Sequence, residues 1–501
     1  MKLTCDFGHM HDTWFGNVNG QVHAFHLKLS PAQDALDTVG HAVSSDLLHW
    51  TRLPDTLPPL RGENERDYHE KFTGCFMIRP AALNGGQQED YLLYYTMRDK
   101  RAGNQRIGVA ISQDMVHFVP WEGNPVYEPD PALCVGYANI GDLPWNIVDC
   151  RDPLVVFDEA AGVYVMYVAA AVLSGEEGIR GGILAVESCD LLHWSKPTVA
   201  YRMKQSGMVE VPDVFFLDGK WVMTLLTGTQ YRGRGGILDP YIQNFTVYAV
   251  ADNPRGPFTE PETDNVLIGG TRDSGASCRS VLWKGRRILF YTDRNPDGNT
   301  LSLPKELHAA GGILRAFYMP ELRSLRVKSL LGGGAYPPAE LLHTSFAWQS
   351  FGGVCDSAED GYRMRTGPQD YQTVLLETRA ASLEMEAAID VQGKAAGFAF
   401  RLFAANGGMR DFVLSAEPLK KRLVLLDNLA FTLVMGREQV FPARRPFFLR
   451  LLILEGTIEA YIDDVLVLQG ALPAFTAVQA GLFCEGGEAV FHGLAAYALE
   501  K

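Results

Sequence analysis

Hydrophobic and polar positions alternate in short runs along the first 330 residues of the chain. Aromatic and β-branched residues gather at 22–29, 91–97, 163–170 and 220–228, and Gly, Pro, Asp and Asn separate these runs. A two-residue period without a long helical period predicts β-strands joined by turns. This part of the chain is therefore expected to be all-β.

A short motif recurs after these strands. HAVSSDLLHW at 41–50 returns as VAISQDMVHF at 109–118 and LAVESCDLLHW at 184–194, with a degenerate copy, YAVADNPRGPF, at 248–258. We expect the Asp to cap the turn and the aromatic residue to pack between neighbouring sheets. Repetition about every 70 residues, with a further strand at 287–294, predicts a five-bladed β-propeller. A large irregular β-sandwich is the alternative, but it does not explain the recurrence.

The pattern changes after residue 330. Residues 331–344 are rich in Gly and Pro and predict a linker. From 345 to 501 the alternating runs become longer, with charged or Gly turns, which predicts a β-sandwich. We expect a propeller over 1–330 to carry the chemistry and the C-terminal β-sandwich to be an accessory domain.

Composition excludes several classes of partner. Hydrophobic residues make up 47% and charged residues 21% of the chain, as in soluble globular proteins. A net charge of −14 argues against binding to nucleic acid or an anionic membrane. With no secretory signal visible and eight Cys but no CxxC pair, we expect a cytoplasmic protein with free thiols. A homodimer is left open.

Three acidic residues stand at the start of different repeats. Asp12 lies in HDTWFGNVNG, Asp152 in CRDP and Glu210 in MVEVPDVFF. Taken singly, they could be a turn residue, a salt-bridge partner of Arg151 and a solvated strand end. The innermost strands of a propeller converge at one end of its axis, so we expect the three carboxyl groups to meet there. Aromatic and apolar neighbours would raise carboxyl pKa values and keep one group protonated near neutral pH.

Such a cluster suits cleavage of a glycosidic bond. One carboxyl group protonates the leaving oxygen, a second acts as base or nucleophile, and a third can hold sugar hydroxyls. We therefore predict a carbohydrate substrate and no cofactor. His9 and His11 beside Asp12 lack a partner set with the spacing of a metal site, so no metal is predicted.

Five motifs in order resemble glycoside hydrolase family 32, the group of invertases, inulinases and levanases, over about residues 5–330. They are GHAVSSDLLHW (40–50), FTG (72–74), CRDP (150–153), EVPDVFFLDGKWV (210–222) and LSLPKEL (301–307). The resemblance implies a propeller followed by a sandwich. It also implies hydrolysis of β-fructofuranosidic bonds in sucrose-like or fructo-oligosaccharide substrates.

The resemblance also implies individual roles. Asp12 occupies the position of the nucleophile, Glu210 that of the general acid/base, and Asp152 that of the residue that stabilises the transition state and binds furanose hydroxyls. Arg151, Phe72 and Thr73 would line the sugar subsite. The implied mechanism is retaining, which requires the two reacting carboxyl groups to lie about 5–5.5 Å apart rather than about 6.5–9.5 Å.

The segment around Asp12 departs from the family pattern. His11 and Thr13 replace the Asn and Pro of the family's Asn-Asp-Pro-Asn-Gly core, and several other subsite positions differ. We expect His11 to contact the substrate. Trp14 and Trp145 could supply replacement stacking surfaces for a sugar, although simple packing is the ordinary role of such residues.

Two other functions stay open. An inverting α-L-arabinofuranosidase-like enzyme would also use a five-bladed propeller with two Asp and one Glu, but the Gly-His-Ala-Val-Ser-Ser-Asp motif argues against it. A carbohydrate-binding protein without catalysis would fit the altered Asp12 segment, but not the retained acids.

Overall fold

The structure of the protein is a computed structural model. It describes residues 3, 10–30, 35–57, 70–86, 88–98, 105–134, 149–173, 179–204, 208–227, 245–262, 265–269, 276–293, 299–331, 341–342, 353–358, 360–376, 379–427, 432–438, 440–441 and 446–500. Within these residues the chain is nearly all β-strand, as predicted. No helix in the described part is long and apolar enough to cross a bilayer.

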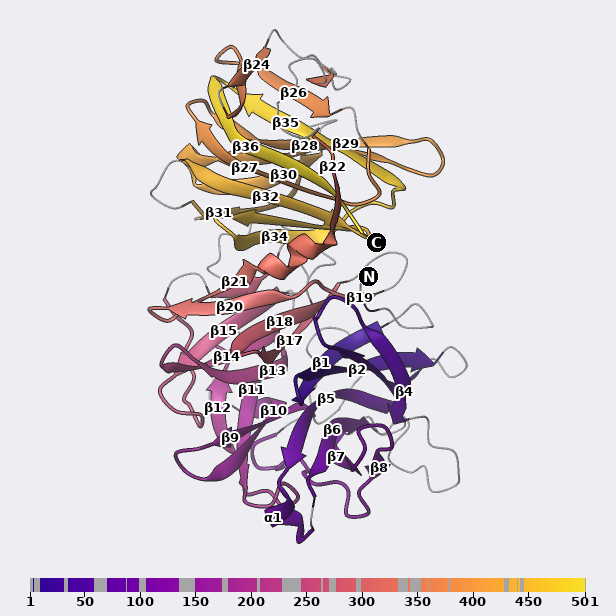
Figure 1. Cartoon of the computed structure of the whole chain (residues 1–501). Coiled ribbons are helices and arrows are strands. Elements are labelled where there is room, and N and C mark those ends of the chain that lie inside the picture. The colour runs from indigo at the N-terminus through magenta and orange to yellow at the C-terminus, as the bar shows by residue number, and fades with distance from the viewer. Residues whose placement is uncertain are drawn as a thin grey trace.

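The strands of the described N-terminal part form five groups of four paired strands (Figure 1). Four of them are separate sheets, and the fifth begins a larger sheet that continues into the C-terminal domain. Blade 1 comprises β1 (Met10–Val18), β2 (Gln21–Ser30), β3 (Ala35–Ser44) and β4 (Thr51–Leu57). Blade 2 comprises β5 (Glu70–Arg79), β6 (Asp90–Arg98), β7 (Gln105–Ser112) and β8 (Val119–Pro120), with α1 (Ala81–Asn84) between β5 and β6. Blade 3 comprises β9 (Cys150–Asp158), β10 (Val163–Leu173), β11 (Ile179–Ser188) and β12 (Thr198–Arg202).

The last two blades complete a ring. Blade 4 comprises β13 (Val209–Leu217), β14 (Lys220–Thr227), β15 (Phe245–Ala251) and β16 (Val266–Ile268). Blade 5 comprises β17 (Ala276–Trp283), β18 (Arg286–Asp293), β20 (Lys305–Ala310) and β21 (Ile313–Tyr318), with β19 (Thr300–Leu301) paired to β18. The first strands β1, β5, β9, β13 and β17 contact one another in that order, and β17 returns to β1. This closed ring confirms the β-propeller.

The repeated Asp caps its turn as expected. In each copy one carboxylate oxygen accepts backbone N–H groups two and three residues further on, and the other oxygen contacts the His three residues further on at 2.6–2.7 Å. The residue after each Asp has a positive φ of 65–70°. The capping residues are Asp46, Asp114 and Asp190. The shared sequence therefore encodes one turn geometry, used in blades 1, 2 and 3.

The aromatic residue after each turn packs against the preceding blade. Each ring lies 5.9–6.4 Å from an aromatic ring on the second strand of that blade. The contact from blade 1 reaches blade 5 and so closes the ring. The pairs are Trp50 with Phe290, Phe118 with Phe25, Trp194 with Tyr94, and Phe258 with Tyr167. Even the degenerate fourth motif retains this contact.

The C-terminal part is a sandwich of two antiparallel sheets around one apolar core. One sheet contains β22 (Arg326–Ser329), β24 (Val354–Ala358), β25 (Gly361–Arg365), β27 (Leu383–Val391), β32 (Phe447–Leu454), β33 (Thr457–Ile462), β34 (Val465–Ala471) and β36 (Glu488–Leu499). The other contains β23 (Leu341–Leu342), β26 (Tyr371–Leu376), β28 (Ala395–Phe403), β29 (Met409–Glu417), β30 (Arg422–Asp427), β31 (Thr432–Glu438) and β35 (Ala477–Glu485).

Buried charges join the sandwich to the fifth blade. Lys305 of β20 pairs with Glu459 of β33, and the hydroxyl of Tyr291 donates to the same carboxylate at 2.8 Å. Lys305 is fully buried and Glu459 is 2% exposed. The backbone contributes as well, because β21 pairs with β34 through Phe317 and Val465. The two domains therefore share one continuous sheet.

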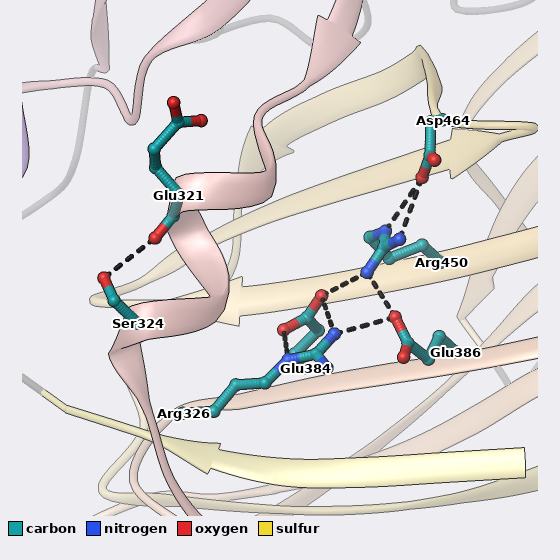
Figure 2. Close-up of polar contacts among 7 residues, drawn as sticks. All are labelled: Glu321, Ser324, Arg326, Glu384, Glu386, Arg450 and Asp464. Carbon is teal, nitrogen blue, oxygen red and sulfur yellow. Dashed lines mark hydrogen bonds and ion pairs between the residues drawn. The ribbon is translucent and has the colours of Figure 1, made fainter.

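Figure 2 shows a second charged cluster beside this junction. Arg450 of β32 contacts Glu384 at 2.5 Å and Asp464 at 2.9 Å, and it also pairs with Glu386. Arg326, which follows the 3₁₀ helix η2 (Pro320–Leu325), contacts Glu384 at 2.7 Å. β22 begins at Arg326 and pairs with β36, so the chain joins the sandwich sheet before residue 330.

The predicted linker, 331–344, lies almost entirely outside the described residues. The proposed boundaries at 330 and 345 therefore stay a prediction.

Candidate active site

A cavity of about 310 Å³ lies at one end of the propeller ring. It is lined by residues from several inner strands, among them Asp12 of β1, Thr73 of β5, Asp152 of β9, Glu210 of β13 and Ser277 of β17. The three acids that the sequence singled out therefore meet in one place. His11, Phe72 and Arg151 line the same cavity.

A β-bulge in each inner strand turns these residues toward the cavity. Pairing with the second strand skips Asp12 in β1 and Thr73 in β5, and it skips two residues at the same place in β9, β13 and β17. A bulge inserts residues that have no partner and so redirects the neighbouring side chains. At these bulges Asp152, Val211 and Ser277 have φ values of 57°, 49° and 57°. Positive φ is strained for non-Gly residues and is concentrated at functional sites.

Two hydroxyl groups hold the carboxylate of Asp12. The Thr73 hydroxyl donates to Oδ2, and the Ser277 hydroxyl donates to Oδ1. The strand of Thr73 is packed closely here, since a Cβ on Gly74 would lie 2.0 Å from the carbonyl oxygen of Tyr94. Two hydroxyl donors, one on each oxygen, fix the orientation of the carboxyl group. The side chain of Asp12 is therefore held from both sides where it lines the cavity.

Arg151 links the other two acids. Its Nη2 donates to Oε1 of Glu210 at 3.0 Å, and its Nε lies 3.6 Å from Oδ2 of Asp152. The side chain of Glu210 is 32% exposed, whereas Asp152 is 3% exposed. Glu210 can therefore reach both substrate and water, while Asp152 lies deeper in the cavity.

Burial changes the ionisation of Asp152. Its pKa is raised to about 7, mainly because burial disfavours the charged form. The positive charge of Arg151 and the N–H of Val211, which donates at 2.9 Å, oppose the rise, whereas Glu210 and Asp12 add to it. The sequence predicts that one carboxyl group of the site stays protonated near neutral pH, and Asp152 is that group.

Arg279 holds the backbone at the bulges of β9 and β13. It is 2% exposed and donates to the carbonyl oxygen of Pro212 and, at 3.3 Å, to that of Pro153. A buried guanidinium that satisfies carbonyl groups of two neighbouring blades restrains both backbones. The positions of Asp152 and Glu210 are fixed in this way.

Of the two tryptophans expected to stack on a sugar, only Trp14 lies within the described residues. Trp14 is 1% exposed and packs among the buried residues between blades 1 and 2, with Phe25 at a ring distance of 6.4 Å. It therefore has no free face for a sugar and acts in packing. Trp145 lies outside the described residues.

Several residues that line the cavity were not found from the sequence. They include Ser277, Asp149, Gln105 and Met208. Ser277 occupies in the fifth inner strand the position that Asp12 and Thr73 occupy in the first two, so a full alignment of the repeats would have found it. Asp149 directly precedes the CRDP motif but belongs to no repeat pattern.

Comparisons with known proteins agree with this architecture. The model of the glycosyl hydrolases family 32 N-terminal domain matches residues 14–295, a span that contains Asp152 and Glu210 and begins two residues after Asp12. A levanase of Bacillus sp. (strain L7) is 32% identical over 296 residues, which cover 56% of this chain and 28% of the levanase. A levanase of Bacillus subtilis (strain 168) is 29% identical over 421 residues, which cover 74% of this chain and 56% of that protein. The chain thus spans between about a quarter and a little over half of these relatives.

Solved structures share the whole fold. The GH32 β-fructofuranosidase BmSUC1 of Bombyx mori superposes with a TM-score of 0.69 at 18% identity, covering 100% of this chain and 93% of that one. Exo-inulinase from Aspergillus awamori gives a TM-score of 0.70 at 17% identity, covering 100% and 98%. Because the family model matches more than half of the chain, the protein belongs to glycosyl hydrolases family 32.

Proposed function

We propose that the protein is a retaining glycoside hydrolase that cleaves β-fructofuranosidic bonds in sucrose-like or fructo-oligosaccharide substrates. The observation that carries the proposal is the meeting of Asp12, Asp152 and Glu210, from three blades, in one cavity. Family membership and the similarity to levanases support this substrate class. An arabinofuranosidase-like function has no comparable support.

In the proposed first step, Asp12 attacks the anomeric carbon while Glu210 donates its proton to the leaving oxygen. The glycosidic bond breaks and an ester forms between the sugar and Asp12. In the second step Glu210 takes a proton from water, and the oxygen of that water displaces Asp12. The hydroxyl groups of Thr73 and Ser277 hold Asp12 in line for the attack.

Asp152 and Arg151 would bind the sugar. A carboxyl group 3% exposed and a guanidinium beside it can hydrogen-bond ring hydroxyls and stabilise positive charge that develops on the ring. Phe72 and His11, which also line the cavity, complete the proposed subsite.

A substrate panel tests the proposal. Sucrose, inulin-type and levan-type oligosaccharides and an α-L-arabinofuranoside are incubated with the wild-type protein and with Glu210→Gln. We expect fructose release by the wild type and a loss of about 10²–10⁴-fold in kcat for Glu210→Gln on sucrose. The control is Glu260→Gln, since Glu260 accepts from Tyr201 at 2.8 Å and does not line the cavity. Binding without turnover of any furanoside would instead indicate a carbohydrate-binding protein.

A further inference from the structure

Asp149 is a fourth carboxyl group in the cavity, and the proposed reaction gives it no role. It directly precedes β9, lines the cavity and is 6% exposed. A buried carboxylate is costly unless a positive group compensates it. Arg151 supplies that charge: its Nη1 lies 2.8 Å from Oδ2 of Asp149, in an ion pair without the alignment of a hydrogen bond.

Arg151 therefore faces three carboxyl groups at once. Nη1 pairs with Asp149, Nη2 donates to Glu210 at 3.0 Å, and Nε lies 3.6 Å from Asp152. The two Nη atoms of a guanidinium can together grip both oxygens of a single carboxylate. In this cavity those two atoms are divided between Asp149 and Glu210.

This division affects the proton donor. A two-bond fork from Arg151 onto Glu210 would favour the ionised form of that carboxyl group. An ionised Glu210 cannot protonate a leaving oxygen. Holding Nη1 on Asp149 leaves Glu210 a single contact with the guanidinium, through Nη2.

Among the described residues, the other groups around Asp149 carry little compensating charge. Burial raises the pKa of the Cys134 thiol to about 11 and that of Cys150 well above its ordinary value, so both thiols are neutral near pH 7. Gln105 is uncharged and accepts the Cys150 N–H at 3.1 Å. Besides Arg151, the other titratable groups in the described part of the cavity wall are Asp12 and His11 of β1, Asp152 of β9 and Glu210 of β13.

We propose that Asp149 is a positioning residue: it holds Nη1 of Arg151 and so prevents Arg151 from forking onto Glu210. The inference rests on the proposed role of Glu210 as proton donor. Asp149 acts through Arg151 and touches no reacting atom.

The test is Asp149→Asn, which keeps the side-chain shape and removes its charge. We expect kcat on sucrose to fall about tenfold, and the alkaline limb of the kcat–pH profile to move down by about one pH unit. On an aryl β-fructofuranoside, whose leaving group needs no protonation, kcat should fall less than about threefold. Asp149→Glu retains the charge and should retain the wild-type limb. An unshifted limb in Asp149→Asn, or an equal shift in both variants, would overturn the inference.

A crystal structure of Asp149→Asn gives a second readout that does not need turnover. We expect both Nη atoms of Arg151 on Glu210, and an unchanged Arg151 would overturn the inference. If the wild type cleaves no furanoside, the proposed function fails, whereas the position of Arg151 still decides the role of Asp149.

Asp90→Asn is the matched control: Asp90 is 7% exposed and lies 3.9 Å from Nη1 of Arg79, but it does not line the cavity. Its pH profile should match that of the wild type.

Discussion

Individual side chains determine how Asp12 is held. Its two oxygens accept hydrogen bonds from Thr73 of blade 2 and Ser277 of blade 5. The carboxyl group of blade 1 is therefore bonded to both neighbouring blades. Ser277 itself stands at a positive φ. The Ser277 hydroxyl therefore orients the proposed nucleophile from the neighbouring blade 5.

Removing one of these hydroxyl groups should slow the reaction more than it destabilises the fold. Ser277→Ala leaves Oδ1 of Asp12 without this donor, and we expect kcat on sucrose to fall about 10–100-fold with little change in Tm. Ser280→Ala is the control on the same strand, because its hydroxyl donates at 2.5 Å to Asp213, which does not line the cavity. It should keep kcat. Equal losses in both variants would show that the hydroxyl of Ser277 has no specific role.

Asp152 should make stability depend on pH. Its pKa is about 7 in the folded protein, against an ordinary value of 3.8. Between these values the folded state holds a proton that the unfolded state has lost, so the free energy of unfolding decreases as pH rises. Above about pH 7 the whole cost of the buried charge is present.

Asp152→Asn removes that cost. We expect the variant to be more stable than the wild type by about 0.5–2 kcal/mol at neutral pH, with loss of activity. Thermal unfolding at several pH values should show a difference in Tm that is small near pH 4 and grows toward pH 7. A difference that is constant over this range would contradict the raised pKa.

The acids could be predicted from the sequence, but some of their partners could not. Asp152 and Glu210 lie beside recognisable motifs at repeat positions, and Asp12 was identified although its segment departs from the family pattern. No motif marks Ser277, so only an alignment of all five inner strands finds it, and Asp149 belongs to no repeat pattern. Trp14 was ambiguous, since an aromatic residue next to an acid suits a sugar platform and a packed seam equally well.

At the scale of elements, one turn and one aromatic contact are used repeatedly. The capping Asp is present in three blades, whereas the contact with the preceding blade is present in all four copies of the motif. The fourth blade keeps Phe258 although its turn sequence has diverged. The repeat could be recognised from sequence because the seam between blades constrains the aromatic residue more strongly than the turn.

Removing an aromatic residue from a contact between two blades should therefore lower the free energy of unfolding. Phe258 is 4% exposed against Tyr167, and Phe258→Ala should reduce the free energy of unfolding by about 3–5 kcal/mol. Phe216→Ala is the matched control, since Phe216 is 56% exposed, and it should cost much less. Chemical denaturation measures both. Similar losses would mean that the seam does not stabilise the ring.

At the scale of the whole molecule, the sandwich is attached to the propeller through buried charges and a shared sheet. Lys305 and Glu459 lie in different domains, and both are almost fully excluded from solvent. Sequence alone could predict the two domains from their different strand patterns. It could not predict this junction, because nothing in either segment indicates which charge will meet which.

Removing one charge of this pair should destabilise the junction. Lys305→Met leaves Glu459 buried without its cation, and we expect a loss of about 3–5 kcal/mol in the free energy of unfolding. Adding Glu459→Leu should recover part of that loss. Lys220→Met removes a lysine that is 48% exposed beside Asp252 and should have almost no effect. An equally small effect at Lys305 would show that the pair does not hold the domains together.

The stereochemistry of hydrolysis tests the central claim most directly. A time course of NMR spectra records the anomer of fructose released first from a levan-type or inulin-type oligosaccharide, before mutarotation. Attack by Asp12 followed by attack of water inverts the anomeric centre twice, so the first product should be the β-anomer. An α-anomer as the first product would contradict the account, because it would require water, rather than Asp12, to attack the substrate.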